Sequence, residues 1–347
     1  MTKSKFTIVL SLVTILTSLI HEVTAIHHMR LTPVILATTD TSTRPFRITN
    51  HCPVDIYPAI QTQAGSGPTF GGYHAIPGNT TSFNVSAGWQ GRIWARTNCT
   101  FNENGTSLNG TGADACLTGD CGGLLNCQGT GKPATLAEFT MIGSMNLSYY
   151  DISLVDGYNL PLGIVSLHNE SSDPELQNIP SNTTNPVCIG SPNFLEAANQ
   201  LENSTTTIPS NSTIGSITYS TPLEMTLGTH AVSRWCPWPL QIQPPWKPGA
   251  GVYPYPDDGI ARPDFDPCLS LCSKYGTSGY CCTGKHDTAD KCSPNLYSKA
   301  AKTVCPDAYS YAYDDTTSTF TVQQGAGFEV IFCPSGRSTN IQKSLAS

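Results

Sequence analysis

Fourteen cysteines are the residues of this 347-residue chain whose type and spacing point most directly to chemistry. Cysteines either bind a metal or pair as disulfides, and the Cys-x3-Cys spacing of Cys268 and Cys272 is within the range of zinc sites. An even number in an exported chain indicates a disulfide framework instead, because oxidising compartments let bridges persist. The adjacent Cys281 and Cys282 also argue against zinc. We therefore expect disulfides among Cys52, Cys99, Cys116, Cys121, Cys127, Cys188, Cys236, Cys268, Cys272, Cys281, Cys282, Cys292, Cys305 and Cys333.

The first 25 residues have the pattern of an export signal. Lys3 and Lys5 precede an apolar run from Phe6 to Ile20, and Val23-Thr24-Ala25 offers a small-residue cleavage site. The run is short for a bilayer span, which argues against a membrane anchor. We predict a signal peptide over 1–25, an N-terminal extension over 26–45, and a protein secreted to the extracellular space or cell wall.

Glycosylation sequons agree with export. Such Asn-x-Ser/Thr triplets mark acceptor sites on exposed loops of secreted proteins. They begin at Asn79, Asn84, Asn98, Asn104, Asn109, Asn146, Asn169, Asn182, Asn203 and Asn211. We expect a glycoprotein in which only some of these sites carry sugar.

The charge balance excludes some partners. Cleaving the signal peptide removes two lysines and one glutamate, so the formal charge changes from −7 to −8. This sign argues against nucleic acid and against an anionic membrane as the main partner. With 12% charged residues, 30 glycines and 26 prolines, the composition is typical of a turn-rich β protein.

Short alternating runs between turn signals predict an antiparallel sandwich. They extend from Phe46 to Phe139, as in Arg92–Arg96, and recur at Tyr149–Val155 and Phe320–Phe332. We expect the last strand to return to the sheet that the first strand began.

Helical signals are few. Ser293-Pro294, an N-cap followed by a first-turn proline, predicts a helix that runs through Val304, and Asp266-Pro267 predicts a second short helix. Both fall between Cys188 and Cys305, a region that we interpret as a disulfide-rich lobe apart from the sandwich.

Two stretches of this lobe lack the sandwich pattern. Residues 189–235 are rich in Ser, Thr and Asn and are interpreted as a glycosylated surface insertion. The loop 237–267 is rich in proline and aromatic residues. We favour a rigid covering linker there, since Pro-rich extension needs no ligand to explain it, and a ligand platform is the alternative.

The stretch Cys116–Cys127, CLTGDCGGLLNC, closely resembles the signature of thaumatin-like proteins, the family of thaumatin and osmotin and of pathogenesis-related family 5. The likeness covers about Phe46 to Cys188 and Cys236 to Ser335. Further stretches match family blocks in the same order: Phe46–Cys52, Gly91–Cys99, Thr135–Phe139, Asp151–Gly157, Cys281–Cys282, Cys305–Tyr311 and Ile331–Pro334.

The resemblance implies a mainly β fold, a flattened β-sandwich with a disulfide-rich lobe carrying short helices. For this chain it implies a domain over 46–335, with the sandwich over about 46–160 plus 312–335, the lobe over about 161–311, and a tail over 336–347.

The cysteines depart from the family pattern in one respect. The family usually has sixteen, and here Val322 occupies the position of one while its partner before Cys188 is also absent. Asp114 also replaces the usual glycine or aromatic residue before the signature. The implied pairs are Cys52 with Cys333, Cys99 with Cys116, Cys121 with Cys127, Cys188 with Cys305, Cys236 with Cys268, Cys272 with Cys281, and Cys282 with Cys292.

In the family, an acidic cleft between sandwich and lobe is lined by one arginine, one glutamate and three aspartates. By position these match Arg92, Glu138, Asp151, Asp156 and Asp307. Glycoside hydrolysis needs two carboxyls across the scissile bond, and we assign this role to Glu138 and Asp151, with Glu138 as the proton donor. We assign Arg92, Asp156 and Asp307 to substrate binding. The structural alternatives are a salt-bridge partner for Arg92, a turn-forming residue for Asp156, and a cap or a tether of the lobe for Asp307.

Strand geometry constrains this set. Alternation puts Arg92, Trp94 and Arg96 on one face of their strand, and Glu138 on the face of Leu136 and Thr140. Asp151 and Asp156 are separated by an odd number of residues, so the turn at Asp156-Gly157 must redirect the chain if both face the cleft.

Three functions compete. The first is weak hydrolysis of bound β-1,3-glucan in cell walls, the second is an antifungal, defence-type protein that binds glucan without turnover, and the third is a protein inhibitor of secreted hydrolases. The family has precedents for all three, so the resemblance fixes the scaffold better than the activity. We expect no cofactor and no metal, a monomer, β-1,3-glucan or a related cell-wall polysaccharide as partner, and no nucleic acid. No feature supports membrane contact.

Overall fold

The computed structural model describes residues 43–110, 112–129, 131, 133–171, 174–177, 184–190, 235–242 and 267–334, and four short strands between 206 and 225. The predicted signal peptide, the extension up to residue 42, most of the insertion 189–235, most of the loop 237–267 and the tail 336–347 lie outside the described residues. Within the described part, no helix is both long and apolar enough to cross a bilayer.

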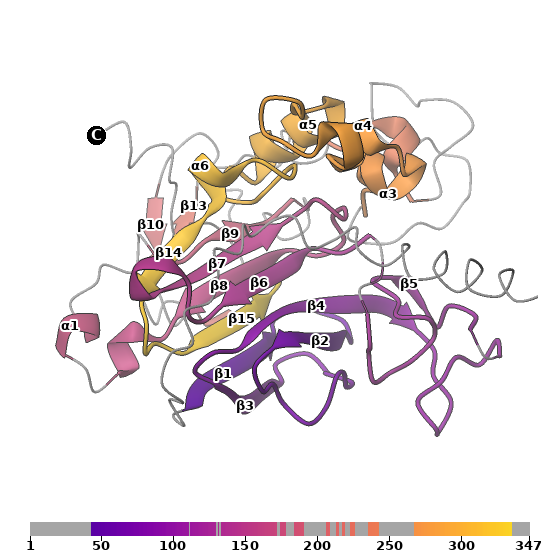
Figure 1. Cartoon of the computed structure of the whole chain (residues 1–347). Coiled ribbons are helices and arrows are strands. Elements are labelled where there is room, and N and C mark those ends of the chain that lie inside the picture. The colour runs from indigo at the N-terminus through magenta and orange to yellow at the C-terminus, as the bar shows by residue number, and fades with distance from the viewer. Residues whose placement is uncertain are drawn as a thin grey trace, which may run out of the picture.

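The strands form two main sheets, which are layered against each other (Figure 1). The larger sheet has the order β14-β7-β6-β4-β2, and β5 pairs with β4 beside this path. Its β4, β6 and β7 pair with their neighbours in antiparallel ladders. The strands are β2 (Tyr57–Ala64), β4 (Gln90–Cys99), β5 (Cys116–Thr118), β6 (Leu136–Thr140), β7 (Leu147–Ser153) and β14 (Phe320–Gln323).

The second sheet has the order β3-β1-β15-β8-β9. Its β15 lies parallel to β1, with Phe46 opposite Phe328, so the prediction that the last strand returns to the first is confirmed. This arrangement makes the chain a mainly β protein, as expected. The strands are β1 (Thr43–Asn50), β3 (Thr80–Ser86), β8 (Leu162–Ser166), β9 (Val187–Cys188) and β15 (Phe328–Phe332).

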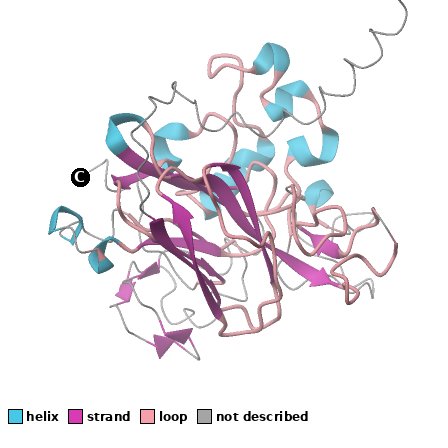
Figure 2. Cartoon of the chain, turned by 60° about the horizontal axis from the view of Figure 1, so that its bottom comes forward, coloured by secondary structure: helices cyan, strands magenta, loops and turns pink. Residues whose placement is uncertain are grey.

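The helices are short and lie around the periphery of the sheets (Figure 2). The helices α3, α4 and α5 gather on one side of the larger sheet, and α6 leads into β14 (Figure 1). Two further small ladders join β10 (Thr206–Ile208) to β13 (Leu223–Met225) and β11 (Thr213–Ile214) to β12 (Ile217–Thr218). The helices are η1 (Ser144–Asn146), η2 (His168–Glu170), α1 (Pro174–Gln177), η6 (Trp238–Leu240), α3 (Leu271–Tyr275), α4 (Ser278–Cys281), η7 (Gly284–His286), α5 (Leu296–Val304) and α6 (Asp315–Ser318).

Aromatic rings fill the core between the two sheets. Phe46 of β1 meets the edge of Phe139 from β6, with 5.1 Å between ring centroids, and Tyr150 lies 4.6 Å from Phe328 of β15. All four are buried. Aromatic pairs in such edge-on or tilted arrangements add about 0.5–1.5 kcal/mol beyond the burial of their area. These rings therefore fix how the larger sheet sits on the smaller one.

Both predicted helix starts were wrong. Helix α5 begins at Leu296, because Asn295 accepts a hydrogen bond from the Ser298 amide while the Ser298 hydroxyl accepts one from the Asn295 amide. This capping box satisfies two free amides where Ser293 would satisfy one. Likewise, α3 begins four residues after Pro267, capped by the Ser270 side chain.

The predicted boundary of the sandwich at residue 160 lies too early. Strands β8 and β9 belong to the five-stranded sheet, with Val330 of β15 opposite Ile164. All five residues of β8 are buried, so this strand has no alternating pattern to reveal it in the sequence.

All fourteen cysteines form disulfides in the structure. The pairs are the ones that the family resemblance implies. They are Cys52–Cys333, Cys99–Cys116, Cys121–Cys127, Cys188–Cys305, Cys236–Cys268, Cys272–Cys281 and Cys282–Cys292.

Candidate functional site

Four polar residues face one another across four neighbouring strands of the larger sheet. Gln61 of β2 lies opposite Arg92 of β4, Arg92 lies opposite Glu138 of β6, and Glu138 lies opposite Asp151 of β7. Directly opposite residues of antiparallel strands have Cβ atoms about 4.5–5.5 Å apart and point to the same side of the sheet. We call Gln61, Arg92, Glu138 and Asp151 the polar row.

The row lies on the face of the sheet that points away from the main core. Trp94 and Leu136, which share strand faces with Arg92 and Glu138, pack in a separate small cluster. The intervening Ile93 and Ala137 belong to the main core. The predicted alternation along both strands is therefore confirmed.

Exposure differs sharply along the row. Arg92 and Asp151 are each 3% exposed, whereas the side chain of Glu138 is 13% exposed. Arg92 Nε lies 3.7 Å from Glu138 Oε1, which is an ion pair longer than a hydrogen bond. Glu138 is therefore the carboxylate of the row that solvent reaches most readily.

Three atoms of the row are buried with no hydrogen-bond partner in the described part of the chain. They are Gln61 Oε1, Arg92 Nε and Asp151 Oδ1. Buried polar atoms in folded proteins are nearly always paired, and exceptions gather at sites that bind water, ions or ligands. Finding three of them in one row sets this part of the sheet apart as a candidate binding site.

The surroundings of Asp151 favour its protonated form. Burial raises the pKa of Asp151 well above its usual range, the charges of Glu138 and Asp315 raise this pKa further, and Arg92 opposes them. A buried carboxyl that lies beside another keeps its proton most easily. Asp151 is therefore a second candidate for the proton donor, beside the expected Glu138.

Asp156 lies beyond the row, in a turn that follows β7. The Gly157 amide donates to Leu154 O at 3.0 Å, and Gly157 has a φ of +110°, where a Cβ would lie 2.6 Å from Cys268 O. A turn is therefore present at the expected position. Asp156 is 7% exposed, and its charge adds to burial in raising the pKa of Tyr297 from α5.

Asp307 also lies outside the row and is fully buried. It comes two residues before Tyr309, which forms an isolated parallel bridge with Ser153 at the end of β7. The structure therefore brings three of the five predicted residues, Arg92, Glu138 and Asp151, into one row, and it places Asp156 and Asp307 in the segments that follow and flank β7.

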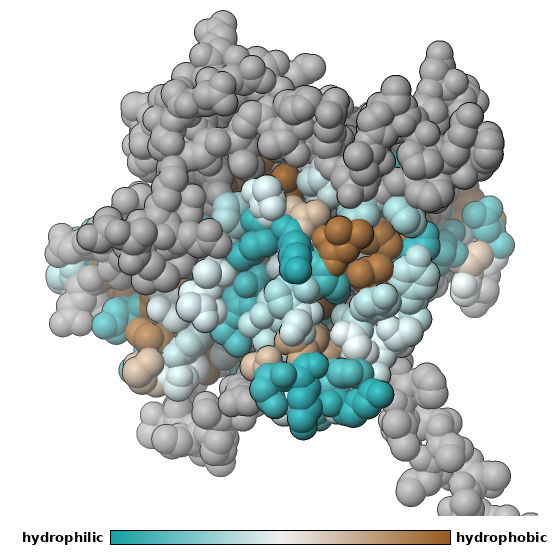
Figure 3. Space-filling view, turned by 90° about the horizontal axis from the view of Figure 1, so that it is seen from above, coloured by the Kyte–Doolittle hydropathy of each residue, from teal (hydrophilic) through white to brown (hydrophobic). Residues whose placement is uncertain are grey.

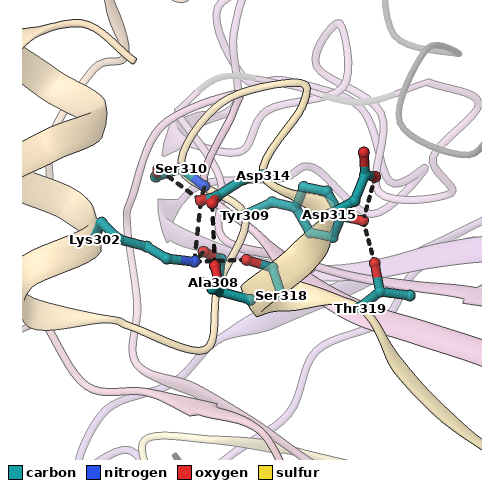
Figure 4. A network of polar contacts seen from close by, with 9 residues as sticks. Lys302, Ala308, Tyr309, Ser310, Asp314, Asp315, Ser318 and Thr319 are labelled. Atoms are coloured by element: carbon teal, nitrogen blue, oxygen red, sulfur yellow. Dashed lines mark hydrogen bonds and ion pairs between the residues drawn. The ribbon is translucent and has the colours of Figure 1, made fainter. Parts of the chain in front are cut away.

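Sequence reasoning missed two groups next to Asp151. Tyr309 Oη donates to Asp315 Oδ1 at 2.8 Å and also contacts Thr319 Oγ1, as Figure 4 shows. Burial, and next the charge of Asp151, raise the pKa of Tyr309. The acidic pair Asp314-Asp315 soon after the Cys305–Tyr311 block was the available sequence signal.

Gln61 was also missed, because an isolated Gln in a strand gives no signal until the register of the strand is known.

Arg96 shares a strand face with Arg92 but has a structural role. It is fully buried and donates to the carbonyl oxygens of Tyr57, Leu124 and Leu125 at 3.0, 2.7 and 2.8 Å. Burial lowers the pKa of Arg96 to about 10. Arg96 thus ties the Cys116–Cys127 loop to the sheet.

Asp120, in the same loop, accepts hydrogen bonds from three backbone amides, those of Ala115, Cys116 and Gly123. The signature therefore codes for a loop whose backbone donors and acceptors are satisfied by two charged side chains.

Residues 50–334 match the family model described as Thaumatin family. The chain belongs to the thaumatin family. This thaumatin-family chain is 35% identical over 292 residues to pathogenesis-related protein 5 of Arabidopsis thaliana, covering 83% of this chain and 90% of that protein. It is also 35% identical over 290 residues to pathogenesis-related thaumatin-like protein 3.2 of Cryptomeria japonica, covering 83% and 87%.

Two solved structures were also similar to the thaumatin-family chain. The thaumatin-like xylanase inhibitor is 31% identical with a TM-score of 0.28, covering 35% of this chain and 74% of that one. A laminaripentaose-producing β-1,3-glucanase, solved in complex with laminaritetraose, is 12% identical with a TM-score of 0.33, covering 83% and 98%.

Figure 3 shows the molecule from above, where the described residues are mostly hydrophilic around a hydrophobic group near the centre, with smaller hydrophobic spots elsewhere.

Proposed function

We propose that this thaumatin-family chain is a secreted defence protein that binds β-1,3-glucan at the polar row and hydrolyses it weakly. The proposal is carried by the alignment of the four polar side chains in one row, three of whose atoms are buried and make no hydrogen bond within the described part of the chain. Arg92 Nε has only its long ion pair with Glu138. A sugar, with several hydroxyls that both donate and accept, is a chemical class that can satisfy these atoms.

The residue types suit a neutral polysaccharide. Gln61 and Arg92 supply planar donor groups, and Glu138 supplies an acceptor that solvent reaches. A few fixed polar groups on a rigid element usually set the orientation of a small ligand. The row spans four strands, so successive groups can contact successive hydroxyls of an extended chain.

Weak hydrolysis follows from the carboxyl pair. Glu138 and Asp151 lie opposite each other, and a separation of about 5–5.5 Å between carboxyls is typical of retaining glycosidases. In the proposed reaction, protonated Asp151 gives its proton to the leaving glycosidic oxygen while Glu138 attacks the anomeric carbon. A water molecule deprotonated by Asp151 then hydrolyses the glycosyl–Glu138 ester and releases the sugar. Because Asp151 is only 3% exposed, we expect binding to exceed turnover.

Purified glycoprotein and laminarin, a soluble β-1,3-glucan, test the proposal in two measurements. Affinity electrophoresis measures binding, and a reducing-sugar assay at mildly acidic pH measures hydrolysis. Glu138→Gln keeps the shape of the side chain but removes its charge, so we expect hydrolysis to stop and binding to persist with up to about ten-fold lower affinity.

Glu103→Gln is the matched control, because Glu103 is exposed on the loop after Phe101. If the wild-type protein binds laminarin but releases no sugar, the proposed hydrolysis is wrong and the proposed binding stands. If the wild-type protein does not bind laminarin, both proposals are wrong.

A further inference from the structure

The polar row has a continuation on the far side of Asp151. Strand β14 pairs with β7, and its first residue, Phe320, lies opposite Tyr150. In an antiparallel ladder the residue before Phe320 then aligns with the residue after Tyr150, which is Asp151. This residue is Thr319, and its backbone is already extended, with φ −87° and ψ 123°.

Tyr309 reaches the same place from a different segment. Its backbone joins β7 on both sides of Ser153, since the Tyr309 amide donates to Ile152 O at 2.8 Å and Tyr309 O accepts from the Leu154 amide at 2.8 Å. The Tyr309 hydroxyl contacts Thr319 Oγ1 and donates to Asp315 Oδ1. Asp315 is therefore held at the end of the row by a tyrosine that is anchored to the strand of Asp151.

The segment that carries Asp315 is fixed from the lobe. Lys302 of α5 forms an ion pair with Asp314 at 3.0 Å and donates to Ala308 O and Ser318 Oγ. Asp314 also accepts from the amide and the hydroxyl of Ser310. Figure 4 shows these two groups of contacts, with Asp314 held at one side and Asp315 turned to the other.

Exposure separates the three carboxyls of this region. Asp315 is exposed, Asp151 is buried, and the Glu138 side chain is 13% exposed. Strand β7 lies between β6, which carries Glu138, and β14, which follows Asp315. The charges of both Glu138 and Asp315 raise the pKa of Asp151, which fits two carboxylates that approach it from opposite sides.

We propose that Asp315 is the second carboxylate that contacts the glucan, so that Glu138 and Asp315 bind the sugar from either side of the buried Asp151. Tyr309 is a positioning residue that acts through Asp315. Strands are about 4.8 Å apart, so β6, which carries Glu138, and β14, which Asp315 precedes, lie roughly 9.6 Å apart on either side of Asp151. This inference rests on the proposed glucan binding.

Laminarin binding by four variants tests the proposal. We expect Asp315→Asn to lower the affinity about ten-fold, the usual loss for a hydrogen bond to a charged group. The amide oxygen of this variant can still accept from Tyr309, so the fold is kept. Asp287→Asn is the matched control, because Asp287 is exposed beside η7 in the lobe, and its affinity should stay within two-fold of the wild type.

Tyr309→Phe separates positioning from folding. We expect a loss smaller than that of Asp315→Asn, and a double variant no weaker than Asp315→Asn alone, because Tyr309 acts through Asp315. If the affinity losses of Tyr309→Phe and Asp315→Asn add up in the double variant, Tyr309 does not act through Asp315. Wild-type affinity in Asp315→Asn would overturn the inference while leaving glucan binding in place, and a wild-type protein without laminarin affinity would overturn both.

Discussion

Glu138 and Asp151 lie directly opposite each other on neighbouring antiparallel strands, yet Asp151 is buried and Glu138 reaches solvent. Two like charges in this relationship would destabilise the sheet. The raised pKa of Asp151 lessens the conflict, because burial favours the uncharged form of this carboxyl. In the proposed hydrolysis, the same burial suits Asp151 to the role of proton donor.

The first prediction concerns pH and stability. The pKa of Asp151 is higher in the folded chain than its unfolded value of about 3.9, so the folded state binds more protons in the interval between the two values. The stability contributed by protonated Asp151 is complete below about pH 4 and is lost as pH rises through the folded pKa. Asp151→Asn mimics the protonated carboxyl and should remove this loss.

Thermal unfolding from pH 4 to 8 measures the effect. The wild type should lose stability relative to Asp151→Asn as pH rises. His51, whose pKa is lowered by burial, contributes the opposite trend near its unfolded value, but it is common to both proteins and cancels in the difference. Parallel curves for the two proteins would show that Asp151 does not titrate with folding.

A substitution at Gln61 should change stability and laminarin binding in opposite directions. Its Oε1 is buried without a hydrogen-bond partner among the described residues, which costs about 1–3 kcal/mol. Gln61→Leu removes the polar atom at similar volume, so we expect the free energy of unfolding to rise by up to about 1 kcal/mol while laminarin affinity falls. Gln63→Leu is the control, because Gln63 is exposed on the same strand. A variant that binds as tightly as the wild type would exclude Gln61 from the site.

Arg96 should behave as a structural residue. Arg96→Met leaves the carbonyl oxygens of Leu124 and Leu125 without a buried donor, so we expect a loss of about 3 kcal/mol in equilibrium denaturation with the disulfides intact. Arg44→Met, at a side chain whose Nη1 donates to Thr43 O at the surface, should cost less than about 1 kcal/mol. Equal losses in both variants would contradict the assigned role.

Lys302 links the lobe to the end of the polar row. Lys302→Met keeps the length of the side chain but removes its ion pair with Asp314 and its bonds to Ala308 O and Ser318 Oγ. We expect a loss of about 2 kcal/mol in stability, together with weaker laminarin binding, because the segment that holds Asp315 is released. Lys299→Met, on the exposed side of α5, is the control. If Lys302→Met is destabilised but binds laminarin like the wild type, the segment that carries Asp315 does not contribute to binding.

The sequence predicts the parts of the fold that depend on local pattern and on family blocks. Alternation in β4 and β6 puts Arg92 and Glu138 on the correct faces, and the disulfide pairs implied by the family resemblance are those of the structure. The rest depends on contacts between distant segments. Gln61 joins the polar row through the register of β2, and Asp315 is held near the end of the row by a hydrogen bond from Tyr309. Neither relationship produces a periodic pattern in the sequence.

Burial was the other property that the sequence could not supply. Asp151 and Asp307 have the same residue type as many surface aspartates, and only the packed structure shows that both are buried. The capping of α5 by Asn295 was hidden for a similar reason, because Ser293 offers an equally good cap until the geometry of the turn is fixed.

The position of β15 between β1 and β8 has a consequence for how the protein is made. Cys52 and Cys333 are 281 residues apart, and β1 has no link to β8 until β15 inserts between them. During synthesis β1 can pair with β3 early, but its other edge must wait until β15 emerges, and such long-range pairing is slow and exposed to aggregation. Nascent chains that stop before β15 should depend on chaperones, and the Cys52–Cys333 bridge should be among the last to close in the secretory pathway.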